Sequence, residues 1–442
     1  MYKLFLILCL LISINTVAQF TGESGVYYLG TANIPISITN YSNPNLNGVV
    51  VRFTWDVLEP TPNSFNWTFI DGEITKAITY NKKISLQPLG VPHWLDSIGV
   101  QQYYYIDKNT AHSTYGHIVS NVLPWDGIYV SRYKNLLQQL AVKYSSNHTV
   151  SYINAIGVAF SRGLPDTVLT DTTLLIKQPF WTAFNYNADT LGLLMNHITD
   201  YYMALFPSTP LWCSVDYVLF QPNATGQARN YLATIYCNYG IANYSDRFGL
   251  FREDISACNP PSSVSSGSQW YIMQQNHCRN GAQMLWSVQD GPTRMNPCGI
   301  LPNTKAIVLD SSVNKGLSYG MRYLEIYGAD ISDASLTTSI QQANTKLIAK
   351  GLECNPSNDI NQQTNDAGFS IYPNPATVSL NIIFSHKQSD KQLIEIYNSI
   401  GLLIKEIAIT DAVELNIANL PIGLYFIHFK NNLLSTQKFI KQ

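Results

Sequence analysis

Hydrophobic positions in the larger part of the chain follow two alternating patterns. Short runs rich in apolar and β-branched residues, such as 49–54 and 83–89, predict buried strands. Between such runs lie stretches with apolar residues three and four positions apart, such as 67–80 and 130–144, which predict amphipathic helices. Strands separated by helices of this length pair in parallel through crossover connections. The pattern therefore predicts a parallel sheet covered by helices.

The same alternation continues to residue 327. The expected strands are 49–54, 83–89, 150–159, 211–220, 247–251, 282–288 and 321–327, and the expected helices are 67–80, 130–144, 191–205, 228–239, 269–278 and 305–316. About eight repeats over residues 19–353 fit an α/β fold of the (β/α)8 TIM barrel type. A doubly wound open sheet is the alternative. No GxGxxG or GxxxxGK[ST] motif occurs, so nucleotide binding has no support.

The tail differs from the large region in its pattern. Residues 369–442 contain short alternating runs, separated by turn residues, at 378–384, 393–397, 402–409, 413–417 and 423–429. Such spacing predicts a small all-β sandwich. Residues 354–368 are polar and have no apolar period, so they are interpreted as a linker.

The amino terminus has the layout of a secretory signal peptide, residues 1–18. Lys3 provides the positive charge, 4–14 is an apolar run, and Thr16, Val17 and Ala18 offer small residues for cleavage. The run is too short to cross a bilayer, which requires about 20 residues. A buried first strand is the alternative. No later stretch is long and apolar enough for a transmembrane segment.

Composition narrows the class of ligand. The 442 residues include 27 Lys+Arg and 29 Asp+Glu, so the net charge of −2 provides no broad basic surface for nucleic acid. Charged residues make up 13%, against about 25% in an average soluble protein. The 28 tyrosines and 8 tryptophans add many aromatic surfaces. This balance favours an exported protein that handles neutral, polar ligands.

Six cysteines remain once Cys9 in the signal is set aside: Cys213, Cys237, Cys258, Cys278, Cys298 and Cys354. An even number in an exported chain suggests disulfides, and free buried thiols are the alternative. Six cysteines allow 15 pairings, and all stay open. No CxxC or tight Cys/His spacing occurs, and the eight histidines are scattered. We therefore expect neither a metal nor another cofactor.

Three motifs in the tail carry a family resemblance. They are IYPNP at 371–375, IYNSIG at 396–401 and LPIGLY at 420–425, followed by a basic end with Lys438 and Lys441. The tail resembles the C-terminal sorting domain of Bacteroidota cargo of the type IX secretion system. The resemblance implies that this machinery carries the protein across the outer membrane, to be secreted or held at the cell surface. It implies no catalytic role for the tail, and an ordinary β-sandwich binding module is the alternative.

A second resemblance covers residues 49–95. The sequence RFTWDVLEP runs from Arg52 to Pro60, FNW at 65–67 leads to a helix start, and PHWL at 92–95 follows the next strand. These segments resemble clan-A (β/α)8 glycoside hydrolases, most of all β-galactosidase-like members. The resemblance implies that 49–54 is the second strand and 150–159 the fourth. It also implies that Glu59 orders a loop and is not catalytic.

Candidate sugar contacts lie at the ends of the expected strands. Trp55, Trp94 and Trp286 present flat rings on which a sugar can stack, with core packing as the alternative. His93 follows a strand and offers a polar group to a sugar hydroxyl, or else is structural. Arg52 lies inside a strand run, so we expect it in the barrel interior beside a carboxylate.

Glycoside hydrolysis requires two carboxylates, which follow strands four and seven in the resembled clan. Here the fourth strand has no Asn-Glu pair, and the seventh is followed by Gln289 and an aspartate. The candidate catalytic acids are Glu325, Asp290, Glu253 and Asp254. Glu253 and Asp254 are adjacent, so on a strand only one of them points inward.

Together these features predict a secreted glycoside hydrolase-like protein. It would cleave a neutral poly- or oligosaccharide by carboxylate acid/base chemistry. Its partners would be that carbohydrate and, through residues 369–442, the secretion machinery. A non-catalytic carbohydrate-binding surface protein on the same barrel is the alternative, favoured by the missing strand-four glutamate, and an exported adhesin is a third hypothesis. No GxSxG or HExxH motif supports other hydrolytic chemistry.

Overall fold

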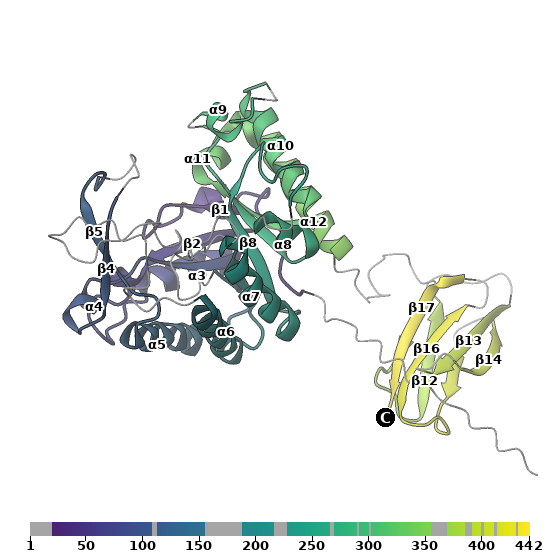
Figure 1. Cartoon of the computed structure of the whole chain (residues 1–442). Helices are drawn as coiled ribbons and strands as arrows, with labels where there is room; N and C mark the ends of the chain where they lie inside the picture. The colour runs from purple at the N-terminus through teal and green to yellow at the C-terminus, as the bar shows by residue number, and fades with distance from the viewer. Residues whose placement is uncertain are drawn as a thin grey trace, which may run out of the picture. The chain divides into compact units, whose positions relative to one another are not determined.

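The computed structural model of the chain contains two compact units, one ending at Asn355 and the other beginning at Pro356 (Figure 1). The residues it describes are 20–107, 113–154, 188–215, 228–265, 269–289, 291–299, 302–354, 369–384, 391–398, 402–410, 413–429 and 432–442. The expected signal peptide, residues 355–368 of the expected linker, and Asp290 lie outside the described residues.

Eight parallel strands close into a barrel in the first unit. In the order in which they pair, these are β1 (Gly25–Leu29), β2 (Gly48–Thr54), β3 (Lys83–Leu89), β6 (Val150–Ile153), β7 (Leu211–Ser214), β8 (Phe248–Ile255), β9 (Asn280–Met284) and β10 (Met321–Tyr327), with β10 pairing back to β1. The expected (β/α)8 barrel is confirmed, and the open sheet is excluded because the ring closes. β2 and β6 are the second and fourth strands, as the resemblance implies.

Helices follow the strands and cover the outside of the barrel (Figure 1). The long helices are α3 (Thr68–Thr79), α5 (Gly127–Tyr144), α6 (Ala188–Leu205), α7 (Ala228–Asn243), α8 (Gln269–Gln275), α10 (Lys305–Ser318) and α12 (Thr337–Cys354). α5 begins where the Asp126 carboxylate accepts hydrogen bonds from the N–H groups of Ile128 and Tyr129. α12 was not expected, although it packs on β1 and β10 and closes the ring of helices.

Shorter elements lie in the loops. They are α1 (Ile38–Tyr41), α2 (Trp55–Leu58), α4 (Trp94–Ser97), a hairpin of β4 (Gln102–Ile106) and β5 (Ile118–Val122), α9 (Pro292–Met295), α11 (Gly328–Ile331) and the 3-10 turn η2 (Ala334–Leu336). Most of them follow the carboxyl ends of barrel strands, where the loops of this fold build binding sites.

The barrel interior is filled by aromatic rings in its amino-terminal half. Tyr27, Tyr152, Trp212, Phe251 and Tyr323 are buried there, and the Tyr152 ring stacks on Trp212 with centroids 4.6 Å apart. A Cβ on residue 249, which is glycine, would come within 2.3 Å of the Trp212 ring. The interior is therefore a packed core whose largest ring depends on a glycine in the neighbouring strand.

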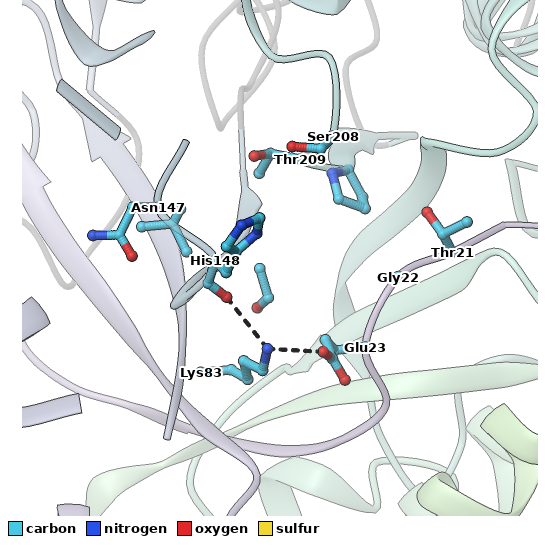
Figure 2. Close-up of a pocket in the computed structure, with 11 residues that line it drawn as sticks. Thr21, Gly22, Glu23, Lys83, Asn147, His148, Ser208 and Thr209 are labelled. Carbon is cyan, nitrogen blue, oxygen red and sulfur yellow. Dashed lines mark hydrogen bonds and ion pairs between the residues drawn. The ribbon is translucent and has the colours of Figure 1, made fainter. Parts of the chain in front are cut away.

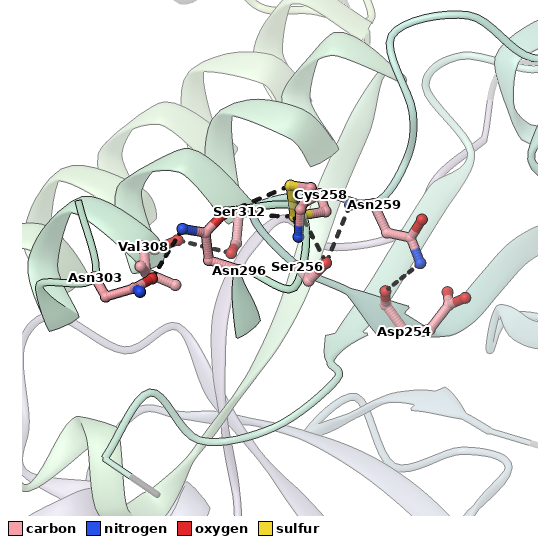
Figure 3. The surroundings of a disulfide bond; sticks show 9 residues. Asp254, Ser256, Cys258, Asn259, Asn296, Asn303, Val308 and Ser312 are labelled. Carbon is pink, nitrogen blue, oxygen red and sulfur yellow. Dashed lines mark hydrogen bonds between the residues drawn. A yellow bond between two sulfur atoms is a disulfide. The ribbon is translucent and has the colours of Figure 1, made fainter. Parts of the chain in front are cut away.

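Two disulfides tie the barrel unit: Cys258–Cys298 and Cys278–Cys354. Figure 3 shows the first, which joins the loop after β8 to the loop after α9. In that loop the Ser256 hydroxyl accepts hydrogen bonds from the N–H groups of Cys258 and Asn259. Cys213 and Cys237 are free and buried, so the expectation of disulfides holds for four of the six cysteines.

The second unit is a pair of antiparallel sheets around one apolar core. One sheet contains β11 (Phe369–Tyr372), β12 (Ser379–Phe384) and β15 (Val413–Asn416), and the other β14 (Leu403–Ile409), β13 (Gln392–Asn398), β16 (Gly423–Phe429) and β17 (Asn432–Lys441). Leu380, Ile396, Ile427 and Phe439 are fully buried in the core. The expected small all-β domain is confirmed. Among the described residues of both units, no helix is long and apolar enough to cross a membrane.

Candidate functional site

Polar side chains replace the aromatic rings toward the carboxyl ends of the barrel strands. Their neighbours along each strand, such as Phe53 and Leu324, pack in the clusters outside the barrel, so strand alternation turns the polar residues toward the axis. We call this set the polar ring: Arg52 on β2, Gln87 on β3, Asn154 directly after β6, Glu253 on β8, Gln283 on β9 and Glu325 on β10.

Strand register places members of the polar ring side by side. Glu325 is paired with Gln283, and Arg52 with Gln87. The Asn154 N–H donates to the carbonyl of Leu86 at 2.8 Å, which puts Asn154 next to Gln87. Residues more than 230 positions apart in the sequence therefore meet at one end of the barrel.

Several polar atoms of the ring have no hydrogen-bond partner among the described residues. They are Arg52 Nε, both amide atoms of Gln87, both amide atoms of Asn154, and Glu325 Oε2. Gln87, Asn154 and Glu325 are fully buried. An unsatisfied buried polar group costs about 1–3 kcal/mol, so such a concentration is typical of a site whose partners arrive with a ligand or with water.

Glu325 is the titratable centre of the ring. The Tyr323 hydroxyl donates to its Oε1 at 2.8 Å. Burial raises the pKa of Glu325 to about 8, while the Tyr323 hydrogen bond and the charge of Arg52 oppose the rise and the charge of Glu253 adds to it. At neutral pH Glu325 therefore carries a proton, as a general acid must.

The two adjacent candidate acids have different surroundings, and they lie where the register between β8 and β9 shifts, between Arg252 and Ile255. Asp254 accepts from Arg252 Nε at 2.9 Å, and the Arg252 guanidinium lies 4.7 Å from the Trp270 ring centroid. The charge of Glu253 instead helps to raise the pKa of Glu325. The structure thus brings Glu325, Glu253 and Arg52 together and leaves Asp254 in an ion pair outside the ring.

The loop after β2 is built around Glu59, which is fully buried. Its Oε2 accepts from Trp55 Nε1, and its Oε1 accepts from the Asn63 N–H and from Arg132, each at 2.7 Å. Glu59 thus orders the loop, as the resemblance implies. Trp94 Nε1 donates to the Glu59 carbonyl at 2.8 Å, which fixes the next loop against this one.

The predicted sugar contacts of strands two and three fall into two groups. Trp55 is 2% exposed and packs against Trp94, Tyr129 and Tyr133, so it has a packing role and no open ring face for the expected sugar contact. Trp94 is partly exposed at the start of α4, and the preceding His93 is exposed.

Trp286 lies in a loop and not at a strand end. β9 stops at Met284, earlier than the expected strand 282–288. Trp286 is partly exposed, and the Arg294 guanidinium covers one ring face at 3.3 Å from the centroid. Gln283 Nε2 bonds the Tyr327 hydroxyl at 3.2 Å, and that hydroxyl donates to the Leu285 carbonyl at 3.5 Å. Tyr327 therefore links the polar ring to the Trp286 loop.

Sequence reasoning missed Gln87, Asn154 and Gln283. Each is one polar residue inside or directly after an apolar strand run, with no motif around it. The signal that could have found them is the phase of alternation, because each lies at an interior position two residues after another interior residue.

A separate cavity of about 170 Å³ lies at the opposite end of the barrel, where β3, β6 and β7 begin. Figure 2 shows Lys83 reaching Glu23, at 3.1 Å, and the His148 carbonyl, at 3.3 Å. This cavity contains none of the predicted site residues. Within the described part of the chain, no three His, Cys, Asp or Glu side chains gather as they would around a metal ion.

Comparison with known families identifies the second unit. Residues 370–442 match the family model of the secretion system C-terminal sorting domain. The tail is a secretion sorting domain. It belongs to the type IX pathway that its motifs resemble, and it indicates export to a secreted or surface-attached location. A search of curated proteins finds none that matches the chain.

Solved structures similar to the chain include three carbohydrate-active enzymes. The catalytic domain of a β-amylase from Paenibacillus polymyxa has a TM-score of 0.46 and 13% identity, covering 75% of this chain and 99% of that one. A β-galactosidase from a Rahnella species has a TM-score of 0.42 and 10% identity, covering 76% and 58%. A psychrophilic family 10 endo-β-1,4-xylanase has a TM-score of 0.38 and 8% identity, covering 74% and 96%.

Proposed function

We propose that the exported barrel binds a neutral oligo- or polysaccharide at the polar ring and hydrolyses one of its glycosidic bonds. The observation that carries the proposal is Glu325. It is a buried carboxyl that keeps its proton at neutral pH, and a second carboxylate, Glu253, lies near enough to influence its charge. Two carboxyl groups held in different protonation states are what acid/base hydrolysis of a glycoside requires.

In this proposal Glu325 is the general acid. Its proton passes to the bridging oxygen as the bond from that oxygen to the anomeric carbon breaks. Glu253 is the second carboxyl group, and in its carboxylate form it either attacks the anomeric carbon or removes a proton from the water that does. Arg52 supplies the positive charge that steadies the Glu325 carboxylate left behind. If Glu253 attacks, a water then attacks the anomeric carbon, breaks its bond to Glu253 and gives a proton to Glu325. If Glu253 instead takes the proton from the water, it releases that proton to solvent and Glu325 regains one from solvent.

The remaining members of the ring would hold the sugar. The amides of Gln87 and Asn154 each offer a donor and an acceptor, as a sugar hydroxyl also does. The exposed part of Trp286 would stack on a sugar unit, and Trp94 and His93 would contact the sugar chain farther out.

A second candidate function is carbohydrate binding without hydrolysis. Strands four and seven, where the resembled glycosidases carry their carboxylates, present the amides Asn154 and Gln283 in this barrel. An amide binds hydroxyls but cannot exchange a proton as a carboxyl does. This hypothesis leaves Glu325 as one more ligand-binding group.

The test is release of reducing sugar from a panel of neutral polysaccharides by the exported full chain. We expect release by the parent and a loss of about 10²–10⁴-fold in Glu325→Gln, the usual contribution of a general acid. Glu353→Gln is the matched control, because Glu353 is an exposed α12 carboxylate paired with Lys350. Circular dichroism checks that both variants fold.

The pH profile and an affinity gel complete the test. Hydrolysis should fall as pH rises through about 8, because Glu325 then loses its proton. Equal release by the parent and Glu325→Gln would remove Glu325 from the chemistry. Retention on one polysaccharide without release would establish the binding protein, and absence of both would overturn carbohydrate recognition.

A further inference from the structure

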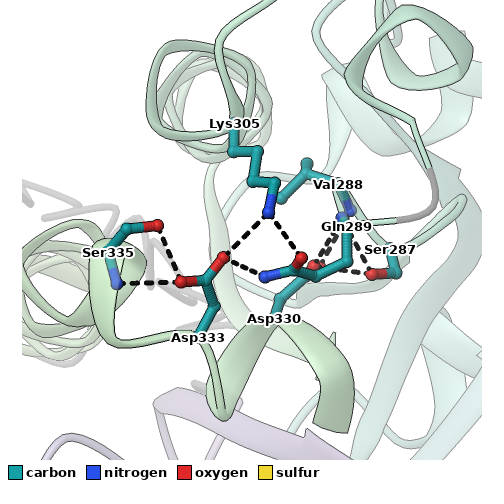
Figure 4. A network of polar contacts seen from close by, with 7 residues as sticks. All are labelled: Ser287, Val288, Gln289, Lys305, Asp330, Asp333 and Ser335. Carbon is teal, nitrogen blue, oxygen red and sulfur yellow. Dashed lines mark hydrogen bonds and ion pairs between the residues drawn. The ribbon is translucent and has the colours of Figure 1, made fainter.

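The loop that carries Trp286 is held by two aspartates from another part of the barrel. Asp330 lies in α11 and Asp333 just after it, both downstream of strand β10, whereas the loop follows strand β9. Figure 4 shows the carboxylates of Asp330 and Asp333 pointing at residues 287–289.

Asp330 makes the central contacts. It is fully buried, and its Oδ1 accepts from the Ser287 hydroxyl at 2.6 Å and the Gln289 N–H at 3.1 Å. Its Oδ2 accepts from the Val288 N–H at 3.1 Å. One carboxylate thus satisfies three consecutive loop residues, which fixes the loop conformation directly after Trp286.

Asp333 adds an outer layer to the same network. It accepts from Gln289 Nε2, from Lys305 at 3.1 Å and from the Ser335 N–H at 2.9 Å. Ser335 and Lys305 hold the pKa of Asp333 well below its usual range, so it stays charged. Lys305 also donates to Gln289 Oε1 at 2.6 Å. Gln289 is therefore held at its backbone by Asp330 and at its side chain by Asp333.

The other side of Trp286 is held as well. The backbone N–H of Trp286 donates to the Met295 sulfur at 3.1 Å, and the backbone N–H of the preceding Leu285 donates to the Ile255 carbonyl at 2.9 Å. The Arg294 guanidinium packs on one face of the indole. Among the described residues, Asp330 makes the most hydrogen bonds to the segment that directly follows Trp286.

We infer that Asp330 is a positioning residue, which holds the 285–289 loop so that Trp286 presents a fixed ring face beside the polar ring. The inference rests on the proposed function, since it assigns Trp286 to sugar binding. Fixing an aromatic ring before the ligand arrives removes an ordering cost from binding. Asp330 should therefore govern affinity and leave the proton transfer steps unchanged.

The test compares Asp330→Asn with Trp286→Phe and with the double variant. In Asp330→Asn an amide NH2 must face N–H donors, so the loop loosens. We expect the affinity for the polysaccharide that retains the parent in the affinity gel to fall about tenfold, with the pH profile of hydrolysis unchanged. On the Trp286→Phe background the same substitution should add little, because coupled residues are not additive. Asp310→Asn, on α10 away from the loop, is the matched control.

Acrylamide quenching of Trp286 provides a readout that does not depend on any ligand. The Trp286 signal is the difference between a protein and its Trp286→Phe counterpart. It should be quenched more strongly in Asp330→Asn than in the parent. If Asp330→Asn fails to fold, Ser287→Ala removes one of the three bonds and should show a smaller change in the same direction.

The outcomes separate the two proposals. Unchanged quenching of Trp286, or equal losses of affinity with and without Trp286, would overturn the role of Asp330. Increased quenching in a protein that binds no polysaccharide would keep Asp330 as the residue that positions Trp286 and reject the carbohydrate site.

Discussion

Glu59 and Glu325 are two fully buried glutamates of one barrel, and they differ in how their oxygens are satisfied. Both oxygens of Glu59 accept hydrogen bonds, from Trp55, the Asn63 N–H and Arg132. Glu325 accepts one hydrogen bond, from Tyr323, and its Oε2 has no partner among the described residues. Burial alone therefore does not distinguish a structural carboxylate from a candidate catalytic one.

The two carboxyl groups differ in the number of hydrogen-bond donors around them. Three donors, one of them a guanidinium, satisfy both oxygens of Glu59, and the loop after β2 is built on these hydrogen bonds. Glu325 meets one hydroxyl at hydrogen-bonding distance, so burial dominates and the proton stays on. In the proposed site, Glu325 Oε2 is the oxygen that a ligand would contact.

Removing the Glu59 carboxylate should have the largest effect on the free energy of unfolding. Glu59→Ala leaves Arg132 and the Trp55 N–H without their partner in a buried site, so we expect a loss of about 3–5 kcal/mol in the free energy of unfolding. Urea denaturation measures this loss. Glu353→Ala, at an exposed position, should stay within about 0.5 kcal/mol. A loss below about 1 kcal/mol in Glu59→Ala would contradict the structural role.

Removing the Glu325 carboxyl should instead stabilise the protein, by an amount that depends on pH. Below pH 4.5 Glu325 is protonated in both the folded and the unfolded chain, so its burial carries no ionisation cost. Between 4.5 and about 8 the unfolded chain loses this proton while the folded chain keeps it, and stability falls by up to about 1.4 kcal/mol for each pH unit. Glu325→Gln removes this cost, so its stability relative to the parent should rise across that window.

Urea denaturation at pH 4, 6 and 8 measures the change. A difference between Glu325→Gln and the parent that stays constant over this range would mean that Glu325 ionises normally in the folded barrel. That result would also remove the physical basis for its role as a general acid.

The smallest effect is expected for Asp254, which is paired with Arg252 outside the polar ring. Asp254→Asn weakens a partly exposed ion pair with Arg252, so we expect a loss of about 1 kcal/mol or less in stability and little change in sugar release. Glu253→Gln, one residue away, should abolish release if the proposed chemistry is right. Equal activity in the two variants would show that the different surroundings of Glu253 and Asp254 do not separate their roles.

Much of the fold could be predicted because the relevant signals are local. The runs that became β2 and β3 and the stripes that became α3 and α5 bury their apolar faces where the periodicity indicates. The structural role of Glu59 followed from the family resemblance of the segment that contains it. The short β1 was not placed, because its amino-terminal position left it beside the expected signal peptide.

The site was harder to predict because it is assembled across the barrel. Gln87, Asn154 and Gln283 have ordinary sequence neighbours, and only closure of the sheet brings them together. The strand expected over 282–288 was too long because its apolar run continues after β9 ends. Val288 bonds its N–H to Asp330 instead of to a neighbouring strand. Trp55 was a candidate sugar contact with core packing as the alternative, and it is buried, with its indole N–H bonded to Glu59.

The disulfide between Cys278 and Cys354 has a mechanical consequence. Cys354 is the last residue of α12, and the chain continues from there toward the sorting domain. A pulling force on the exported tail would reach the barrel unit at this residue, and the covalent bond would pass it into the turn before β9. While the bond is intact, α12 therefore cannot be peeled away from its carboxyl end.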